Sequence, residues 1–127
     1  MGTRFMVTRE APIHEGIKQK VVEMDGNQTR LIFRSYKNTA RVYRNVVADE
    51  VASIEAAGGE FGQVHNLVSG ANQEKAWSTG DIDAGMVTMG MSGGLINDIP
   101  SCEELVRNVV GDAERIIDQR LAGMTAA

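Results

Sequence analysis

Apolar residues recur at helical spacing in the first part of the chain, directly after Pro12. Ile17, Val21 and Met24 stand four and three positions apart, which places them on one face of a helix over residues 13–24. Proline is favoured where a helix begins, because its missing N–H would have no partner there. The pattern therefore predicts a helix with one buried stripe.

The next stretch changes to the spacing of a strand. Residues 29–36 alternate between two faces, and we expect Leu31 and Phe33 to share one face while Ile32 lies on the other. A polar turn follows, and residues 40–44 are then placed to return beside the first strand. These residues predict a two-stranded hairpin.

The rest of the chain is mostly helical. Helices are expected at 46–57, 61–68 and 72–78, with glycines close to their ends. A last helix begins after Ser101, which forms the pattern of a capping box with Glu104. Its apolar stripe consists of Leu105, Val109, Ala113, Ile116, Ile117 and Leu121. Because strands and helices do not alternate regularly, the expected fold class is α+β, mostly helical with a two-stranded hairpin.

The composition is that of an ordinary globular chain that is poor in aromatic residues. Its 127 residues can form one core, and its net charge of −4 leaves no basic field for a nucleic acid. No apolar run approaches about 18 residues, and Cys102 is the single cysteine, so we expect a cytoplasmic protein without a disulfide that does not enter a membrane. Three Phe, two Tyr and one Trp beside seven Met and 14 Gly fit a piece that packs against further chain.

The titratable residues show no pattern of a catalytic or metal centre. His14 is expected to cap the first helix or lie on the surface, and His65 to be exposed, since neither has a partner Asp, Ser or Cys at a useful spacing. The basic residues near the hairpin fit an exposed face better than a contact for phosphate or an acidic partner. They are Arg30, Arg34, Lys37, Arg41 and Arg44. We assign no catalytic and no metal-binding residue.

Two glycine-containing segments are candidates for binding chemistry. Gly2 and Thr3, expected on a loop that follows a strand, offer backbone N–H groups and a hydroxyl to an anion, usually a phosphate. Between Gly85 and Gly94, glycines and methionines surround a threonine and a serine. Such a segment suits the edge of a flat aromatic ligand, and it equally suits a tight crossing of helices built from small residues.

Three motifs follow one another along nearly the whole chain. They are Gly2-Thr3-Arg4-Phe5 with Thr8 to Pro12 and His14, then Arg34-Ser35 with Asn38 to Val42 and Arg44-Asn45, then Gly80-Asp81 with Gly90, Gly94-Leu95-Ile96, Asp98-Ile99-Pro100, Cys102 and Glu104-Leu105. In this order the motifs resemble those of the nitronate monooxygenase (2-nitropropane dioxygenase-like) family, and the arrangement is most similar to its NADH:quinone reductase branch.

The resemblance implies the C-terminal part of an FMN enzyme on a TIM-barrel scaffold, with the barrel incomplete in this chain. Residues 1–12 would be the end of a barrel strand with a phosphate loop. Residues 13–84 would be a small helical domain with the hairpin, and residues 85–127 would return to the flavin pocket and end in the last helix.

The resemblance also implies roles for particular residues. Gly2 and Thr3 would hold the FMN phosphate, and Gly90, Met91 and Ser92 would line the substrate pocket. The parent enzyme would reduce a quinone with NAD(P)H, or would oxidise an alkyl nitronate. The family carries either Gln or Met at the position of Met91.

Parts of the family pattern have no counterpart in this chain. They are the N-terminal barrel strands, the first phosphate loop and the active-site histidine of a GGH segment, and Met1 aligns with an internal methionine. We therefore expect a truncated or internally started chain that is inactive alone. Two other hypotheses remain. One is a non-catalytic helical module that self-associates or docks on a barrel partner, and the other is a small binding domain.

Overall fold

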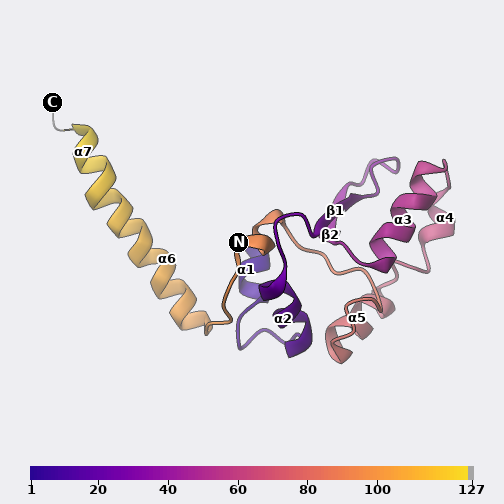
Figure 1. Cartoon of the computed structure of the whole chain (residues 1–127), viewed down its shortest axis with the longest axis horizontal. Coiled ribbons are helices and arrows are strands. Elements are labelled where there is room, and N and C mark those ends of the chain that lie inside the picture. Colours follow the sequence, from indigo (N-terminus) through magenta and orange to yellow (C-terminus); the bar gives the residue numbers. More distant parts are fainter. Residues whose placement is uncertain (126–127) are drawn as a thin grey trace.

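The computed structural model describes residues 1–125 and shows one two-stranded antiparallel sheet with short helices beside it, and one longer helix that extends away from them (Figure 1). The elements are α1 (Gly2–Met6), α2 (Glu15–Glu23), β1 (Thr29–Ile32), β2 (Ala40–Tyr43), α3 (Val46–Ala56), α4 (Phe61–Val64), α5 (Gly70–Thr79), the 3₁₀-helix η1 (Met91–Leu95), α6 (Cys102–Ile116), the π-helical turn η2 (Ile117–Leu121) and α7 (Ala122–Thr125). The mostly helical fold with one hairpin confirms the predicted fold class.

A third segment, residues 87–89, runs beside the hairpin, and we call it the edge segment. The N–H of Tyr43 donates to the carbonyl of Val87 at 2.8 Å, and the N–H of Met89 donates to the carbonyl of Arg41 at 3.2 Å. These bonds lie on either side of an antiparallel bridge between Val42 and Thr88. The glycine-rich stretch is therefore aligned by β2 before it reaches Gly90. The hairpin itself pairs Thr29 with Tyr43, Arg30 with Val42, Leu31 with Arg41 and Ile32 with Ala40.

A buried amide fixes the chain just before the edge segment. Asn45 caps α3 by accepting the N–H of Ala48 on its Oδ1 at 2.9 Å. Its Nδ2 donates to the carbonyls of Ile82 and Gly85, at 2.5 Å and 2.8 Å. Because a buried amide is stable only when both ends are bonded, Asn45 joins the start of α3 to the loop at 82–85.

Two groups of buried side chains support these elements. The first packs α2 and α5 against the edge segment and the chain that follows η1, and consists of Val7, Ile17, Val21, Met24, Ala76, Val87, Met89 and Ile96. The second packs the hairpin on α3 and α4, and consists of Ile32, Phe33, Val42, Val47, Ala48, Val51 and Val64. The edge segment thus lies where the first core meets the sheet.

Leu31 and Ile32 lie on opposite faces of β1 as predicted, but the prediction that Phe33 shares the face of Leu31 is wrong. Ile32 is fully buried, whereas Leu31 is 37% exposed, so the core-facing side is the one carrying Ile32. Phe33 is buried too, but it has left the strand with φ at +62°. The reason is that α3 packs on the Ile32 face, and the left-handed turn at Phe33 swings its ring back to the same core.

The carboxylate of Glu55 on α3 stabilises that turn. It accepts the N–H of Phe33 at 2.7 Å and, from Ser35, the backbone N–H at 3.1 Å and the hydroxyl at 2.8 Å. Burial alone raises the pKa of the Glu55 carboxyl, but the hydrogen bonds from Ser35 and Phe33 together lower it below its ordinary value of 4.5. The ionised carboxylate is therefore part of the native turn.

The loop at residues 8–10 anchors the last helix. The N–H of Arg9 donates to the carbonyl of Pro100 at 2.9 Å, and the buried Lys18 of α2 donates from Nζ to the Arg9 carbonyl at 3.2 Å. The carboxylate of Glu10 accepts the N–H of Cys102 at 2.9 Å. The predicted capping box of Ser101 and Glu104 is also present.

Replacing Gly94 by alanine tests a close approach between two segments of backbone. A Cβ at Gly94 would lie 2.7 Å from the Cα and the N of Gly26, whereas a Cβ at Gly62 would meet nothing within 4 Å. We expect Gly94→Ala to lower the free energy of unfolding by roughly 1–3 kcal/mol, because backbone must move, and Gly62→Ala to have a much smaller effect. Urea denaturation of both variants checks this, and equal midpoints would contradict it.

Replacing Glu55 by glutamine tests the carboxylate-bound turn. Because the folded-state pKa lies below the ordinary value, the stabilisation is complete above the unfolded-state pKa and is lost as the pH falls through the lowered pKa. We expect wild-type stability to decline over that acid range and the decline to be smaller in Glu55→Gln. Urea denaturation as a function of pH measures this, with Glu50→Gln at an exposed position of α3 as the control.

Candidate functional site

The two predicted binding segments meet at a single hydrogen bond. Thr3 on α1 accepts the N–H of Gly90 on its Oγ1 at 2.8 Å, across 87 positions of sequence. Gly90 caps η1, whose first residues are Met91 and Ser92. The structure therefore brings Thr3 against Gly90. Gly2 precedes Thr3 in the chain, and Met91 and Ser92 follow Gly90. We call this set of residues the α1–η1 site.

A second contact from α1 holds the other end of η1. Arg4 donates from Nη1 to the carbonyl of Asp98 at 3.0 Å and from Nη2 to its carboxylate at 2.5 Å. Thr3 and Arg4 thus bind the chain just before and just after η1. Arg4 and Asp98 both belong to the sequence motifs, but nothing in their positions along the chain indicates that they pair.

The predicted loop at the start of the chain is wrong, since residues 2–6 form the helix α1. The N–H groups of Arg4 and Phe5 bond back to the carbonyl of Met1, at 3.0 Å and 3.3 Å. A helix satisfies these groups within itself, whereas a strand would need a neighbour. Gly2 and Thr3 lie in the first turn, where backbone N–H groups have no partner within the helix.

Tight packing, one of the two functions that composition left open for the glycine-rich stretch, accounts for part of it. A Cβ at Gly85 would lie 2.3 Å from the Asn72 carbonyl oxygen, and one at Gly94 would strike backbone too, so these glycines allow tight packing. A Cβ at Gly90 would meet only Thr3 Oγ1 at 3.5 Å and Ser92 Oγ at 3.7 Å, which are ordinary contacts. Packing explains Gly85 and Gly94, and it does not explain Gly90.

The outer side of the α1–η1 site is apolar and open. Met91 is 62% exposed and Leu95 is 85% exposed, while Gly2 and Ser92 are exposed as well. The inner side is closed, because Gly93 packs against the sulfur of Met24. A ligand at this site would meet backbone and a hydroxyl on α1, and flexible apolar side chains on η1.

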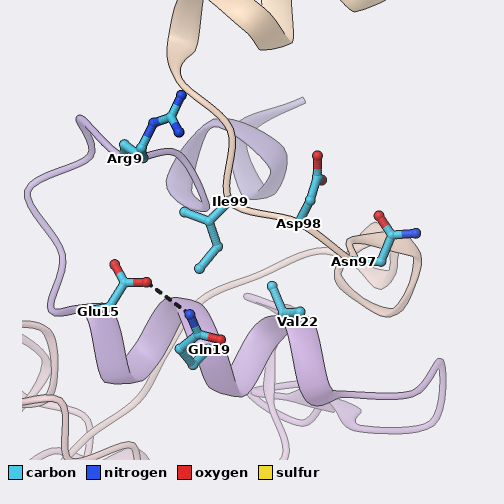
Figure 2. A pocket seen from close by; sticks show the side chains of 7 residues that line it. All are labelled: Arg9, Glu15, Gln19, Val22, Asn97, Asp98 and Ile99. Carbon is cyan, nitrogen blue, oxygen red and sulfur yellow. Dashed lines mark hydrogen bonds between the residues drawn. The ribbon is translucent and has the colours of Figure 1, made fainter.

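A shallow cavity of about 430 Å³ lies beside the Arg4–Asp98 pair (Figure 2). In Figure 2, Ile99 and Val22 point toward the space between α2 and the segment after η1, and Glu15 bonds Gln19 at 3.0 Å along α2. Its lining residues are Arg9, Glu15, Gln19, Val22, Asn97, Asp98 and Ile99. None of the predicted site residues lines it, so it is a neighbour of the α1–η1 site and not the site itself.

The histidines and most of the basic residues have structural roles. His14 caps α2, with Nδ1 accepting the N–H of Gly16 at 3.0 Å, as expected. His65 is exposed and packs edge-on against Phe61. Asp49 pairs with Arg30 and with Arg44, which favours the interpretation of an exposed structural face. Within the described residues, no three His, Cys, Asp or Glu side chains gather into a group that could hold a metal ion.

Two carboxylates near the start of α6 stay ionised for structural reasons. The N–H of Cys102 lowers the pKa of Glu10, and the N–H and hydroxyl of Ser101 lower the pKa of Glu104. Arg9 also pairs with Glu104. A carboxyl whose pKa is lowered is a poor proton donor near neutral pH, so these groups hold the helix start and do not suggest acid catalysis.

Comparison with known proteins places this chain in a family and identifies several relatives. The family model of nitronate monooxygenase matches residues 1–112. A (3aS,4S,5R,7aS)-5-hydroxy-7a-methyl-1-oxo-octahydro-1H-indene-4-carboxyl-CoA dehydrogenase from Mycobacterium tuberculosis is 23% identical over 89% of this chain and 42% of its own length. The enzyme of the same name from Rhodococcus jostii is 25% identical over 93% of this chain and 44% of its own length.

Solved structures agree with the fold. FabK from Thermotoga maritima superposes with a TM-score of 0.86 at 25% identity, over 98% of this chain and 39% of that chain. A mutant of the same protein gives a TM-score of 0.75 at 23% identity, over 98% of this chain and 35% of the mutant chain. The chain thus spans less than half the length of these relatives. No helix within residues 1–125 is long and apolar enough to cross a membrane.

Replacing Thr3 by valine tests the contact that joins the two parts of the site. Valine keeps the shape but removes the oxygen that accepts the Gly90 N–H. We expect the Gly90 amide to exchange with solvent about five- to tenfold faster, because a hydrogen bond of this kind contributes about 1 kcal/mol. Hydrogen exchange followed by NMR measures this, and Thr3→Ser should keep the native rate. An unchanged rate in Thr3→Val would show that the contact does not hold η1.

Proposed function

The chain belongs to the nitronate monooxygenase family, whose members are flavin-dependent oxidoreductases, and we propose that it supplies the C-terminal half-site of an FMN-dependent enzyme of this family. The hydrogen bond between Thr3 and Gly90 carries the proposal, because it joins the segment assigned to the FMN phosphate to the segment assigned to the substrate side. These assignments came from separate motifs, and the hydrogen bond places the two segments side by side, as a shared ligand would require.

The residues of the α1–η1 site fit a phosphate in their chemistry. Thr3 uses its oxygen as an acceptor for Gly90, so its hydroxyl hydrogen is left to donate to a phosphate oxygen. Gly2 and Thr3 add backbone N–H groups from the first turn of α1. Gly90 has no side chain to keep a ligand from approaching. FMN would supply the redox chemistry, and these residues would bind and orient it.

The exposed side chain of Met91 favours a flat, apolar electron acceptor. Burial of this flexible side chain against a ring would remove apolar surface from water. We therefore propose NAD(P)H as the electron donor and a quinone as the acceptor, with oxidation of an alkyl nitronate as the second choice. The setting we propose is cytoplasmic.

We expect the chain alone to show little or no turnover. It covers 39% of the FabK chain that it matches, and the sheet within residues 1–125 has two strands, not the eight of a closed barrel. NADH oxidation by the purified chain with added FMN tests this expectation, and a rate normal for an enzyme would contradict it.

A second candidate function is a non-catalytic helical module that self-associates or docks on a barrel partner. The observation in its favour is the exposed apolar side of α6, which includes Val106, Val109 and Val110. A solitary globular chain seldom leaves such a row of apolar side chains in water.

A titration with FMN and with riboflavin tests the phosphate assignment. We expect FMN to bind and riboflavin, which lacks the phosphate, to bind at least about tenfold more weakly. Thr3→Ala should abolish most of that preference, and Gly90→Ala should weaken both ligands without unfolding the chain, because a Cβ at Gly90 has ordinary contacts. Flavin fluorescence measures the binding.

Gly62→Ala serves as the control for this titration, because its Cβ would lie in open space on α4. It should bind both flavins as the wild type does. Equal affinities for FMN and riboflavin, or no saturation with a folded chain, would overturn the assignment of Gly2 and Thr3 to the phosphate.

A further inference from the structure

The hairpin concentrates positive charge in a chain that is acidic as a whole. Residues 26–48 include five arginines and lysines and no Asp or Glu, whereas the whole chain has a net charge of −4. Two of these residues, Arg30 and Arg44, pair with the same carboxylate, Asp49 of α3, where the hairpin packs on that helix (Figure 1). One carboxylate balances only one of the two charges, so the pair stays positive.

Asp49, in the first turn of α3, holds two guanidinium groups side by side. Its Oδ1 accepts from Nη1 of Arg30 and, at 3.2 Å, from Nε of Arg44, which also contacts Oδ2 at 3.4 Å. Burial alone raises the pKa of Asp49, but the hydrogen bonds from Arg30 and Arg44 lower it below its ordinary value of 3.8. The carboxylate is therefore ionised at neutral pH and orients both arginines.

A cavity of about 220 Å³ is lined by Thr29, Arg30 and Arg44. Asp49 uses one nitrogen of each guanidinium group, so each group keeps further N–H donors. Thr29 Oγ1 accepts from Nη1 of Arg41 at 2.9 Å, which leaves the Thr29 hydroxyl hydrogen to donate. Each side chain that lines the cavity therefore offers a hydrogen-bond donor.

Donors and positive charge together are the chemistry that recognises a phosphate. Guanidinium groups bind phosphate oxygens through short, charge-assisted hydrogen bonds, in a planar geometry that suits two oxygens at once. Arg41 adds a third guanidinium group next to Thr29, against the single carboxylate of Asp49. The cavity is smaller than the roughly 300–1,000 Å³ that encloses a drug-sized ligand, so it suits one small anionic group.

A second cavity, of about 430 Å³, shares Arg44 with the small one. Its lining includes Tyr43, Val46 and Ile82, which offer apolar surface, and the carboxylate of Asp83. Apolar surface beside an acceptor suits a base and the hydroxyl groups of a sugar. A phosphate in the small cavity can therefore be free, or it can belong to a nucleotide whose remainder lies in the larger cavity.

We infer that Thr29, Arg30 and Arg44 form a binding site for a phosphate group, carried by inorganic phosphate or by a nucleotide. The site lies on the hairpin and at the start of α3, and it shares no residue with the α1–η1 site. It therefore does not depend on the proposed flavin binding. Pairing with Asp49 is then the means by which two arginines are oriented toward a ligand.

An NMR titration of the full chain with AMP, inorganic phosphate and adenosine, at constant ionic strength, tests the site. We expect saturable shifts of the amide signals of residues 29, 30 and 44 with AMP and with phosphate, and at least about tenfold weaker binding of adenosine, which lacks the phosphate. Tighter binding of AMP than of phosphate identifies a nucleotide as the source, and equal binding identifies the free anion. Adenosine that binds as tightly as AMP, or no saturation with a folded chain, overturns the inference.

Two matched arginine variants distinguish a defined site from general attraction by positive charge. Arg30→Gln should weaken phosphate binding at least about tenfold, because it removes a guanidinium group that lines the cavity. Arg34→Gln removes the same charge from the same hairpin but not from that cavity, so it should bind phosphate within about twofold of the wild type. Equal losses in the two variants would contradict a defined site.

Replacing Thr29 by valine gives a second test that leaves both pairs with Asp49 intact. Valine keeps the shape and suits a strand, but it has no hydroxyl to donate. We expect about fivefold weaker phosphate binding in Thr29→Val and wild-type binding in Thr29→Ser. Wild-type affinity in a folded Thr29→Val would overturn the assignment of Thr29 to the site.

The same variants separate this site from the flavin proposal. Arg30→Gln should keep the wild-type preference for FMN over riboflavin, and Thr3→Ala should keep wild-type phosphate binding, because the two sites share no residue. A single variant that abolishes both would indicate one shared site and overturn the inference of a second one.

Discussion

The α1–η1 site depends on the hydrogen bond from Gly90 to Thr3, and that bond depends on the strand-like path of residues 87–89. Three sets of contacts hold the edge segment in place. Asn45 fixes the loop before it, and backbone hydrogen bonds to Arg41 and Tyr43 align it. After the edge segment, Thr3 accepts the N–H of Gly90. Each contact joins segments far apart in sequence, so the site exists only when the hairpin, α3 and α1 have all formed.

A second set of contacts positions the last helix independently of that site. The loop at residues 8–10 uses a backbone bond to Pro100, the carboxylate of Glu10 and the buried ammonium of Lys18. Because these groups meet at the start of α6, the helix is directed away from the body and its apolar face stays uncovered. The contacts that hold the start of α6 are thus separate from the contact between Thr3 and Gly90.

Local chemistry allowed much of the fold to be predicted. The capping box of Ser101 and Glu104, the cap at His14 and the hairpin all follow from residues within a few positions of one another, and all three are confirmed. Phe33 was wrongly grouped with Leu31, because alternation assumes that the strand continues and does not indicate the left-handed turn at Phe33. The start of the chain was wrong because a glycine and a threonine next to each other are compatible with a loop or a first helical turn.

For the candidate site too, the sequence indicated single segments but not how they come together. Motifs alone suggested Gly2, Thr3, Gly90, Met91 and Ser92, and no periodicity could show that the two groups touch. The pairing of Arg4 with Asp98, which closes η1, carries no signal in sequence either. The sequence by itself determined most of the helices, the hairpin and the family, because these rest on short-range spacing and on motif order. Only the tertiary structure decided which glycines pack against backbone and which one, Gly90, has room for a side chain, because that depends on which distant backbone comes close to each.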